Sequence, residues 1–97
     1  MSSKLQALAD SMVLKAKRCP GRPIKKLLPR GLGLGFGLSP DGAEARLVVV
    51  RKGVEPSEIE VHIIRQAFKV PGDAEVTEIN KDGWLGVRLS WPWEGGR

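Results

Sequence analysis

The feature that most constrains the fold is a strict alternation over residues 32–38, where a large apolar residue stands at every second position with a glycine between. An extended strand would place the two sets on opposite faces, because its side chains alternate with a period of two. The apolar residues are Leu32, Leu34, Phe36 and Leu38, and the glycines are Gly33, Gly35 and Gly37. The stretch predicts a strand with one bare face, on which another segment can lie closely. That segment is most often a helix of the same protein and less often a partner.

Residues 39–50 continue this strand into a hairpin. Ser39-Pro40-Asp41-Gly42 has proline at the second turn position and glycine at the fourth, as a type I turn prefers. Glu44 to Val50 returns as a second strand, and its last four residues are all apolar. A strand that is apolar on both faces is predicted to be central or covered.

The segment 58–68 has two interpretations. Its first six residues alternate like a strand, but Ser57 and Glu60 have the spacing of a capping box. The continuation to Phe68 also favours a helix, and we predict one. Its polar residues share one side and are Glu58, His62, Arg65, Gln66 and Lys69.

Two further strands complete the predicted body. Residues 74–79 predict a third strand, and the turn at 80–83 places Gly83 where a hairpin needs a positive φ. Residues 84–91 predict a fourth strand, which Pro92 ends. Its inward residues are Leu85, Val87, Leu89 and Trp91, and its outward residues are Trp84, Gly86, Arg88 and Ser90.

The N-terminal residues predict an amphipathic helix that begins at about Lys4. Ser3 and Gln6 have capping-box spacing, and Pro20 ends the helix because proline disfavours α geometry in the residue before it. The apolar stripe needs a surface to pack on, which is the protein's own body, a second copy or a partner. The stripe consists of Leu5, Leu8, Ala9, Met12 and Ala16.

Residues 19–31 are rich in proline, glycine and basic residues, and they predict an extended strap of about 40 Å instead of a folded element. The predicted fold class is α+β, with an N-terminal helix and this basic strap followed by a small antiparallel β-β-α-β-β body. We place the basic helix and strap in residues 1–31 and the compact domain in residues 32–97. The second helix is expected to cover one face of the sheet, and the N-terminal helix part of the other.

Charge is strongly segregated along the chain. Residues 1–30 carry a net charge of +7, whereas residues 31–97 carry −2. Seven cations and no acidic residue lie between positions 15 and 30, and self-repulsion holds such a run apart unless an anionic partner neutralises it. These candidate nucleic-acid-binding residues are Lys15, Lys17, Arg18, Arg22, Lys25, Lys26 and Arg30.

Part of this run, residues 17–26, resembles an AT-hook, a short basic arm that enters the minor groove of DNA. The resemblance rests on Gly21-Arg22-Pro23 and the flanking cations. The sequence departs from that pattern at Pro20, which stands where the first core arginine belongs, with Arg18 displaced by two positions. The resemblance implies a binding mode, an extended basic backbone in a groove, and not a family.

Enzyme signatures are not found in the sequence. The glycines at 31–37 fall on every second residue and do not fit the spacing of a dinucleotide-binding loop. His62 is expected on a polar helix face without a nucleophile, and one cysteine with one histidine cannot build a metal site. We therefore expect no catalysis, no metal and no cofactor.

A second candidate surface is the pair Trp84 and Arg88 on the outward face of the last strand. Such a pair is common at protein interfaces and also forms a stacking platform for bases. The alternative is that the N-terminal helix covers Trp84.

These features lead to two functional hypotheses. The first is a small accessory protein that binds DNA or RNA through phosphate contacts of its basic arm. The second is a protein-binding module, such as an inhibitor or assembly subunit encoded by a phage or mobile element. The single cysteine and the lack of an apolar run long enough for a membrane span predict a cytoplasmic protein without membrane contact. A basic N-terminus is also typical of organelle-targeting segments or of a merely solvated tail.

Overall fold

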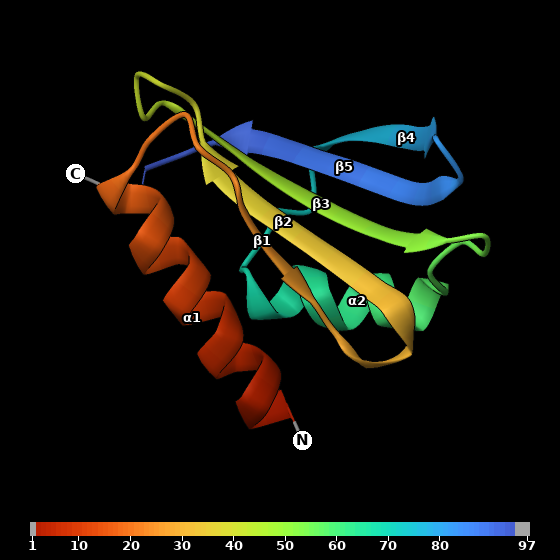
Figure 1. The fold of residues 1–97 in the computed structure, drawn as a ribbon. Coiled ribbons are helices and arrows are strands. Elements are labelled where there is room, and N and C mark those ends of the chain that lie inside the picture. The colour runs from red at the N-terminus through yellow and green to blue at the C-terminus, as the bar shows by residue number, and fades with distance from the viewer. Residues whose placement is uncertain (1, 95–97) are drawn as a thin grey trace.

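The computed structural model describes residues 2–94, with side chains from residue 4 onward, as two helices and a five-stranded antiparallel sheet (Figure 1). The strand order is β1-β2-β3-β5-β4. This α+β architecture confirms the predicted fold class. In chain order the elements are α1 (Ser2–Arg18), β1 (Ile24–Leu27), the 3-10 turn η1 (Pro29–Gly31), β2 (Leu32–Leu38), β3 (Glu44–Lys52), α2 (Glu58–Ala67), β4 (Glu75–Lys81) and β5 (Trp84–Pro92).

Strand β3 lies in the centre of the sheet, as its doubly apolar sequence predicts. Leu47 on β3 is paired with Phe36 on β2 and with Leu89 on β5, and all three side chains are buried on the same face. The turn between β2 and β3 is closed by a hydrogen bond of 2.8 Å from the Gly42 N–H to the Ser39 carbonyl. The hairpin expected from the alternation at residues 32–38 is therefore confirmed.

Both helices pack on this same face of the sheet and touch one another (Figure 1). The expectation that α1 covers part of the opposite face is wrong. Five strands span about 19 Å, whereas a helix with its side chains is only about 10 Å wide, so α2 alone cannot cover the apolar face. Ala9, Met12 and Ala16 of α1 are 0–1% exposed and join the core formed by the sheet and α2.

The first helix begins at Ser2, two residues before the predicted start, and ends at Arg18 before Pro20 as predicted. The capping box predicted from Ser3 and Gln6 involves Ser3, whose side chain lies outside the described part of the structure. The side-chain amide of Gln6 donates to Asp10 at 3.1 Å and to the carbonyl of Ala67, at the end of α2, at 3.3 Å. Gln6 therefore joins the two helices.

Helix α2 confirms the helical interpretation of residues 58–68. The Ser57 hydroxyl accepts from the Glu60 N–H at 3.2 Å, and the Glu60 carboxylate accepts from the Ser57 N–H at 2.9 Å. Glu60 also pairs with Arg51 of β3 and thereby ties the start of α2 to the sheet. The Arg51 guanidinium, followed by the Ser57 N–H, lowers the pKa of Glu60 from 4.5 to about 2.

The segment predicted as a free strap is partly folded. Ile24–Leu27 pairs with β2 as the edge strand β1, and Ile24 packs against the core. The chain then turns through Arg30 and Gly31, which have φ angles of 68° and 76°. The prediction failed because β2 offers a row of backbone groups that a neighbouring extended segment can pair with, whatever its side chains. The helix and strap assigned to residues 1–31 thus share one core and one sheet with residues 32–94.

Gly86 marks the closest approach of two strands. A Cβ placed on this residue of β5 would lie 1.9 Å from the Val49 carbonyl oxygen and 2.8 Å from the Val50 Cα of β3. No side chain fits in that space without movement of backbone. The position therefore requires glycine, because the backbones of the neighbouring strands β3 and β5 lie in close contact there.

Candidate nucleic-acid interface

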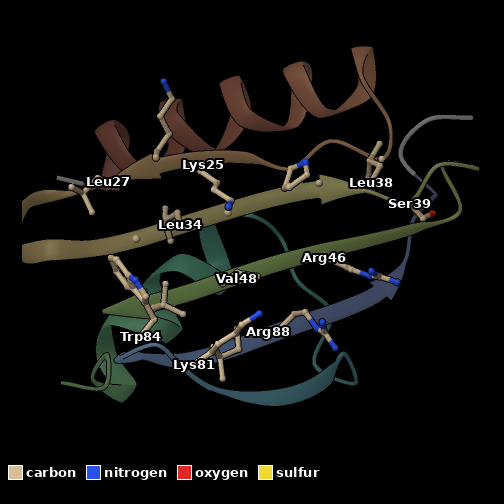
Figure 2. A pocket seen from close by; sticks show the side chains of 18 of the residues that line it. Lys25, Leu27, Leu34, Leu38, Ser39, Arg46, Val48, Lys81, Trp84 and Arg88 are labelled. Carbon is tan, nitrogen blue, oxygen red and sulfur yellow. The ribbon is translucent and has the colours of Figure 1, made fainter. Parts of the chain in front are cut away.

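The sheet face turned away from both helices is uncovered and holds a groove of about 890 Å³ (Figure 2). We call this surface the open face. Residues of β1, β2, β3, β4 and β5 project from it, because side chains alternate between the two sides of each strand. The residues of the groove used below are Lys25, Gly35, Arg46, Val48, Ile79, Lys81, Trp84 and Arg88.

The glycines of β2 form part of the floor of this groove. The expectation that a helix of the protein lies against them is wrong, since both helices pack on the other side. Instead, Pro23 lies over Gly37, where a Cβ would be 3.1 Å from the proline Cα. At the other end the Trp84 ring reaches Gly33, where a Cβ would be 3.7 Å from the ring edge. Gly35 lies between these two contacts.

Trp84 extends from β5 across β3 to the edge of β2 (Figure 2). The alternative that α1 covers this ring is wrong, because α1 packs on the opposite face. Lys52 and Lys81 are the register partners of Trp84 on β3 and β4, and the Lys52 ammonium lies 5.6 Å from the ring centroid. The ring is thus half-buried at one end of the groove, between two exposed lysines.

Four basic side chains project into the groove from both of its sides, and they are Lys25, Arg46, Lys81 and Arg88 (Figure 2). Among the lining residues of the described chain, Asp82 is the one carboxylate, and it belongs to an exposed turn. Glu44 pairs with Arg46 at 3.0 Å, but both side chains are about half exposed, so the pair is weak. Glu44 and Glu75 lie near Arg88 at the margin of the open face.

The seven basic residues predicted to bind nucleic acid fall into two groups, those that line the groove and those that lie outside it. All seven are exposed, and within residues 4–94 none of them forms an ion pair. Lys25 and Lys26 both line the groove with Trp84 and Arg88, although the pairing of Lys26 with Leu34 directs its side chain to the other side of β1. The others lie outside the groove: Lys15, Lys17 and Arg18 end α1, Arg22 follows them, and Arg30 lies at the β1–β2 turn.

The end of α1 nevertheless adjoins one end of the groove. Gly21 and Pro23 line it, and the Gly21 N–H donates to the Leu38 carbonyl at 2.7 Å. Arg22, between these two residues, is therefore held beside the groove. Lys17 turns toward the other side of the molecule, where its ammonium lies 5.9 Å from the Trp93 ring.

The sequence reasoning missed Arg46, Lys52 and Lys81 as members of this surface. Arg46 and Lys81 are single cations in mixed segments and Lys52 has only Arg51 beside it, so none of them belongs to a long run of charge. The signal that finds them is strand parity: Arg46 pairs with Gly37, and Lys81 pairs with Trp84. Residues outward on one strand identify their outward partners on the next once the register is known.

Comparison of the chain with protein-family models, with curated proteins and with solved structures gives no match. Over residues 2–94, neither helix has the length and apolar character needed to cross a membrane. In the same range no three His, Cys, Asp or Glu side chains gather as metal ligands.

Proposed function

We propose that this protein binds nucleic acid without catalysing a reaction on it, through phosphate contacts of the open face and the adjoining end of α1. The observation that carries the proposal is the uncovered groove into which Lys25, Arg46, Lys81 and Arg88 project, with Asp82 as the one carboxylate among its described lining residues and Glu44 and Glu75 at its margin. Cations that line a concave, solvent-exposed surface attract a polyanion. When they neutralise its phosphates, the counterions of those phosphates are released, and this release contributes to the binding affinity.

The arm contributes in a different way from the one implied by the AT-hook resemblance. Pairing of Ile24–Leu27 with β2 and the Gly21–Leu38 hydrogen bond hold Arg22 against the domain. A segment fixed in this way cannot follow a minor groove as a free arm does. We infer that Lys15, Arg18 and Arg22 extend the basic surface of the groove and add phosphate contacts at its end.

A salt titration tests the proposal. Fluorescence anisotropy of a labelled oligonucleotide, measured from about 50 to 200 mM KCl, should show log affinity falling with log salt at a slope of about −0.7 to −0.9 per phosphate contact. Arg46→Gln with Arg88→Gln should make that slope shallower by about 1.4 to 1.8. The matched control is Lys4→Gln with Lys69→Gln, which removes the same charge from exposed positions outside the groove. An affinity that does not depend on salt concentration would refute the proposal. So would an equal change of slope for the two double variants.

A protein-binding module is the second candidate, and the apolar surface of α2 favours it. Ile59 and Ile63 lie one helical turn apart and are 73% and 45% exposed. Deleting residues 1–30 cannot separate the two functions, because it removes Ala9, Met12 and Ala16 from the core. Ile59→Ser with Ile63→Ser is the sharper test: loss of a captured protein with nucleic-acid binding intact would support the second function.

We also infer a cytoplasmic setting. Cys19 is a free, exposed thiol, and such a thiol persists in a reducing compartment. Fractionation of cells that express the tagged chain would test this, and recovery in an oxidising compartment with Cys19 in a mixed disulfide would contradict it.

A further inference from the structure

We propose that the open face selects single-stranded nucleic acid and that one base stacks on Trp84. This inference rests on the proposed function and specifies the class of nucleic acid. It is drawn from the chemistry of the middle of the groove, which differs from that of its margins.

The middle of the groove is apolar. Gly35 and Val48 lie in one row between Lys25 on β1 and Arg88 on β5, and Ile79 lies beyond them on the edge strand β4. Duplex nucleic acid presents phosphates on its outside and keeps its bases stacked inside, so an apolar strip gains little from it. Unpaired bases are apolar on their faces and can cover such a strip while their phosphates reach the cations beside it.

Trp84 supplies a stacking surface at one end of this strip. One edge of its ring reaches the β2 backbone at Gly33, so the ring spans the sheet from β5 to β2. Lys52 and Lys81 flank it on the neighbouring strands and are exposed. Each is placed to reach a phosphate on either side of a base that stacks on the indole.

Gly35 is the second independent observation. Neither its φ angle nor its surroundings require glycine: a Cβ there would lie 3.7 Å from the Val48 Cβ and 3.9 Å from the Lys25 Cγ, both ordinary contacts. Glycine in a strand interior weakens the strand relative to residues with side chains. Gly35 is buried between the side chains of Val48 and Lys25, so a ligand reaches its backbone only as the flexible Lys25 side chain moves aside. A glycine that the fold does not demand leaves room for that approach.

The test compares four probes on the wild-type chain by anisotropy: a single-stranded DNA of about 12 nucleotides, the same sequence as RNA, the corresponding duplex, and heparin, a polyanion without bases. We expect either single strand to bind at least about tenfold more tightly than the duplex or heparin. The two single-stranded arms distinguish DNA from RNA.

Substitutions locate the stacking. Trp84→Leu should weaken single-strand binding by roughly 5- to 100-fold and leave heparin binding unchanged, because it removes aromatic surface and no charge. Trp84→Phe should keep most of the affinity. Gly35→Val should weaken single-strand binding without lowering the melting temperature, and it reports on the groove without relying on Trp84.

The possible results separate the two proposals. If no nucleic acid binds in a salt-dependent way, the proposed function fails. If duplex, heparin and single strands bind equally well, or if Trp84→Leu with unchanged circular dichroism binds single strands like the wild type, the function stands and the single-strand inference is overturned.

Discussion

On one side of β2 the side chains of Leu34 and Phe36 are 2% and 0% exposed, whereas on the other side Gly33 and Gly35 present only backbone. The first face is covered by two helices and the second by none (Figure 1). One strand therefore carries the fold on one side and the candidate binding surface on the other. We therefore expect that residues of the open face can be substituted without unfolding the protein, as long as the new side chain does not collide with the backbone of a neighbouring strand.

The sharpest test of this division is a pair of substitutions on adjacent residues of β2. Phe36→Ala should destabilise the protein by about 3–5 kcal/mol, because it empties a core position in contact with Phe68, Trp91 and Trp93. Gly35→Ala should leave the stability within about 0.5 kcal/mol of wild type. Urea unfolding followed by circular dichroism measures both, and comparable losses would show that the two faces are not separable.

Gly86→Ala tests the limit of that tolerance, since it lies on the open face but meets backbone. The added methyl group would fall on the Val49 carbonyl, and we expect a loss of about 1–3 kcal/mol or more. Gly72→Ala is the matched control, because its φ is not positive and a Cβ there has no neighbour within 4 Å. A Gly86→Ala protein as stable as the control would mean that β3 and β5 can separate at this point.

Acid should lower the stability of the protein through the Arg51–Glu60 pair, which ties α2 to the sheet. The pKa of Glu60 is about 2 in the folded protein and 4.5 without the fold, so the ionised group stabilises the protein above about pH 4.5. This contribution is lost as the pH falls from 4.5 toward 2, where the folded carboxylate takes up its proton. Glu60→Gln should lower the melting temperature at neutral pH by several degrees, about 4–8 °C for each kcal/mol lost. The melting temperature of this variant should also fall less steeply between pH 4.5 and 2 than that of the wild type. An unchanged dependence of the melting temperature on pH would contradict the role of the Arg51–Glu60 pair.

The corresponding pair on the open face should matter least. Glu44→Gln removes the half-exposed partner of Arg46, and we expect a change in stability below about 0.5 kcal/mol. Nucleic-acid affinity should rise by roughly twofold to threefold, because Arg46 is released and a negative charge leaves the margin of the groove. Anisotropy at low salt measures the gain. Weaker binding would place the nucleic acid away from Arg46.

The local elements were predictable from the sequence because their signals are local. The Gly/Leu alternation defines β2, the turn at residues 39–42 defines the hairpin, and Ser57 with Glu60 defines the start of α2. The position of α1 was not predictable. Its apolar stripe fits any apolar surface, and the choice of side depends on how much of the core face α2 leaves uncovered.

The candidate site was only partly predictable for a similar reason. Lys25, Trp84 and Arg88 were found by charge and by alternation, but they come from two distant parts of the chain, β1 and β5. Their meeting with Arg46 and Lys81 depends on the strand order β1-β2-β3-β5-β4, in which β5 inserts between β3 and β4. The run of cations from residue 15 to residue 30 attracted attention to the arm, although most of those residues lie outside the groove.

The contact between Gly86 and the β3 backbone has a consequence for genetic work on this protein. An allele that places a large side chain at Gly86 would lower the amount of folded polypeptide, so its phenotype would approach that of a deletion. An allele at Gly35 or Trp84 would keep the polypeptide at normal abundance and disable one surface. Complementation with the two kinds of allele would therefore show whether a cell requires only the folded protein or also its intact open face.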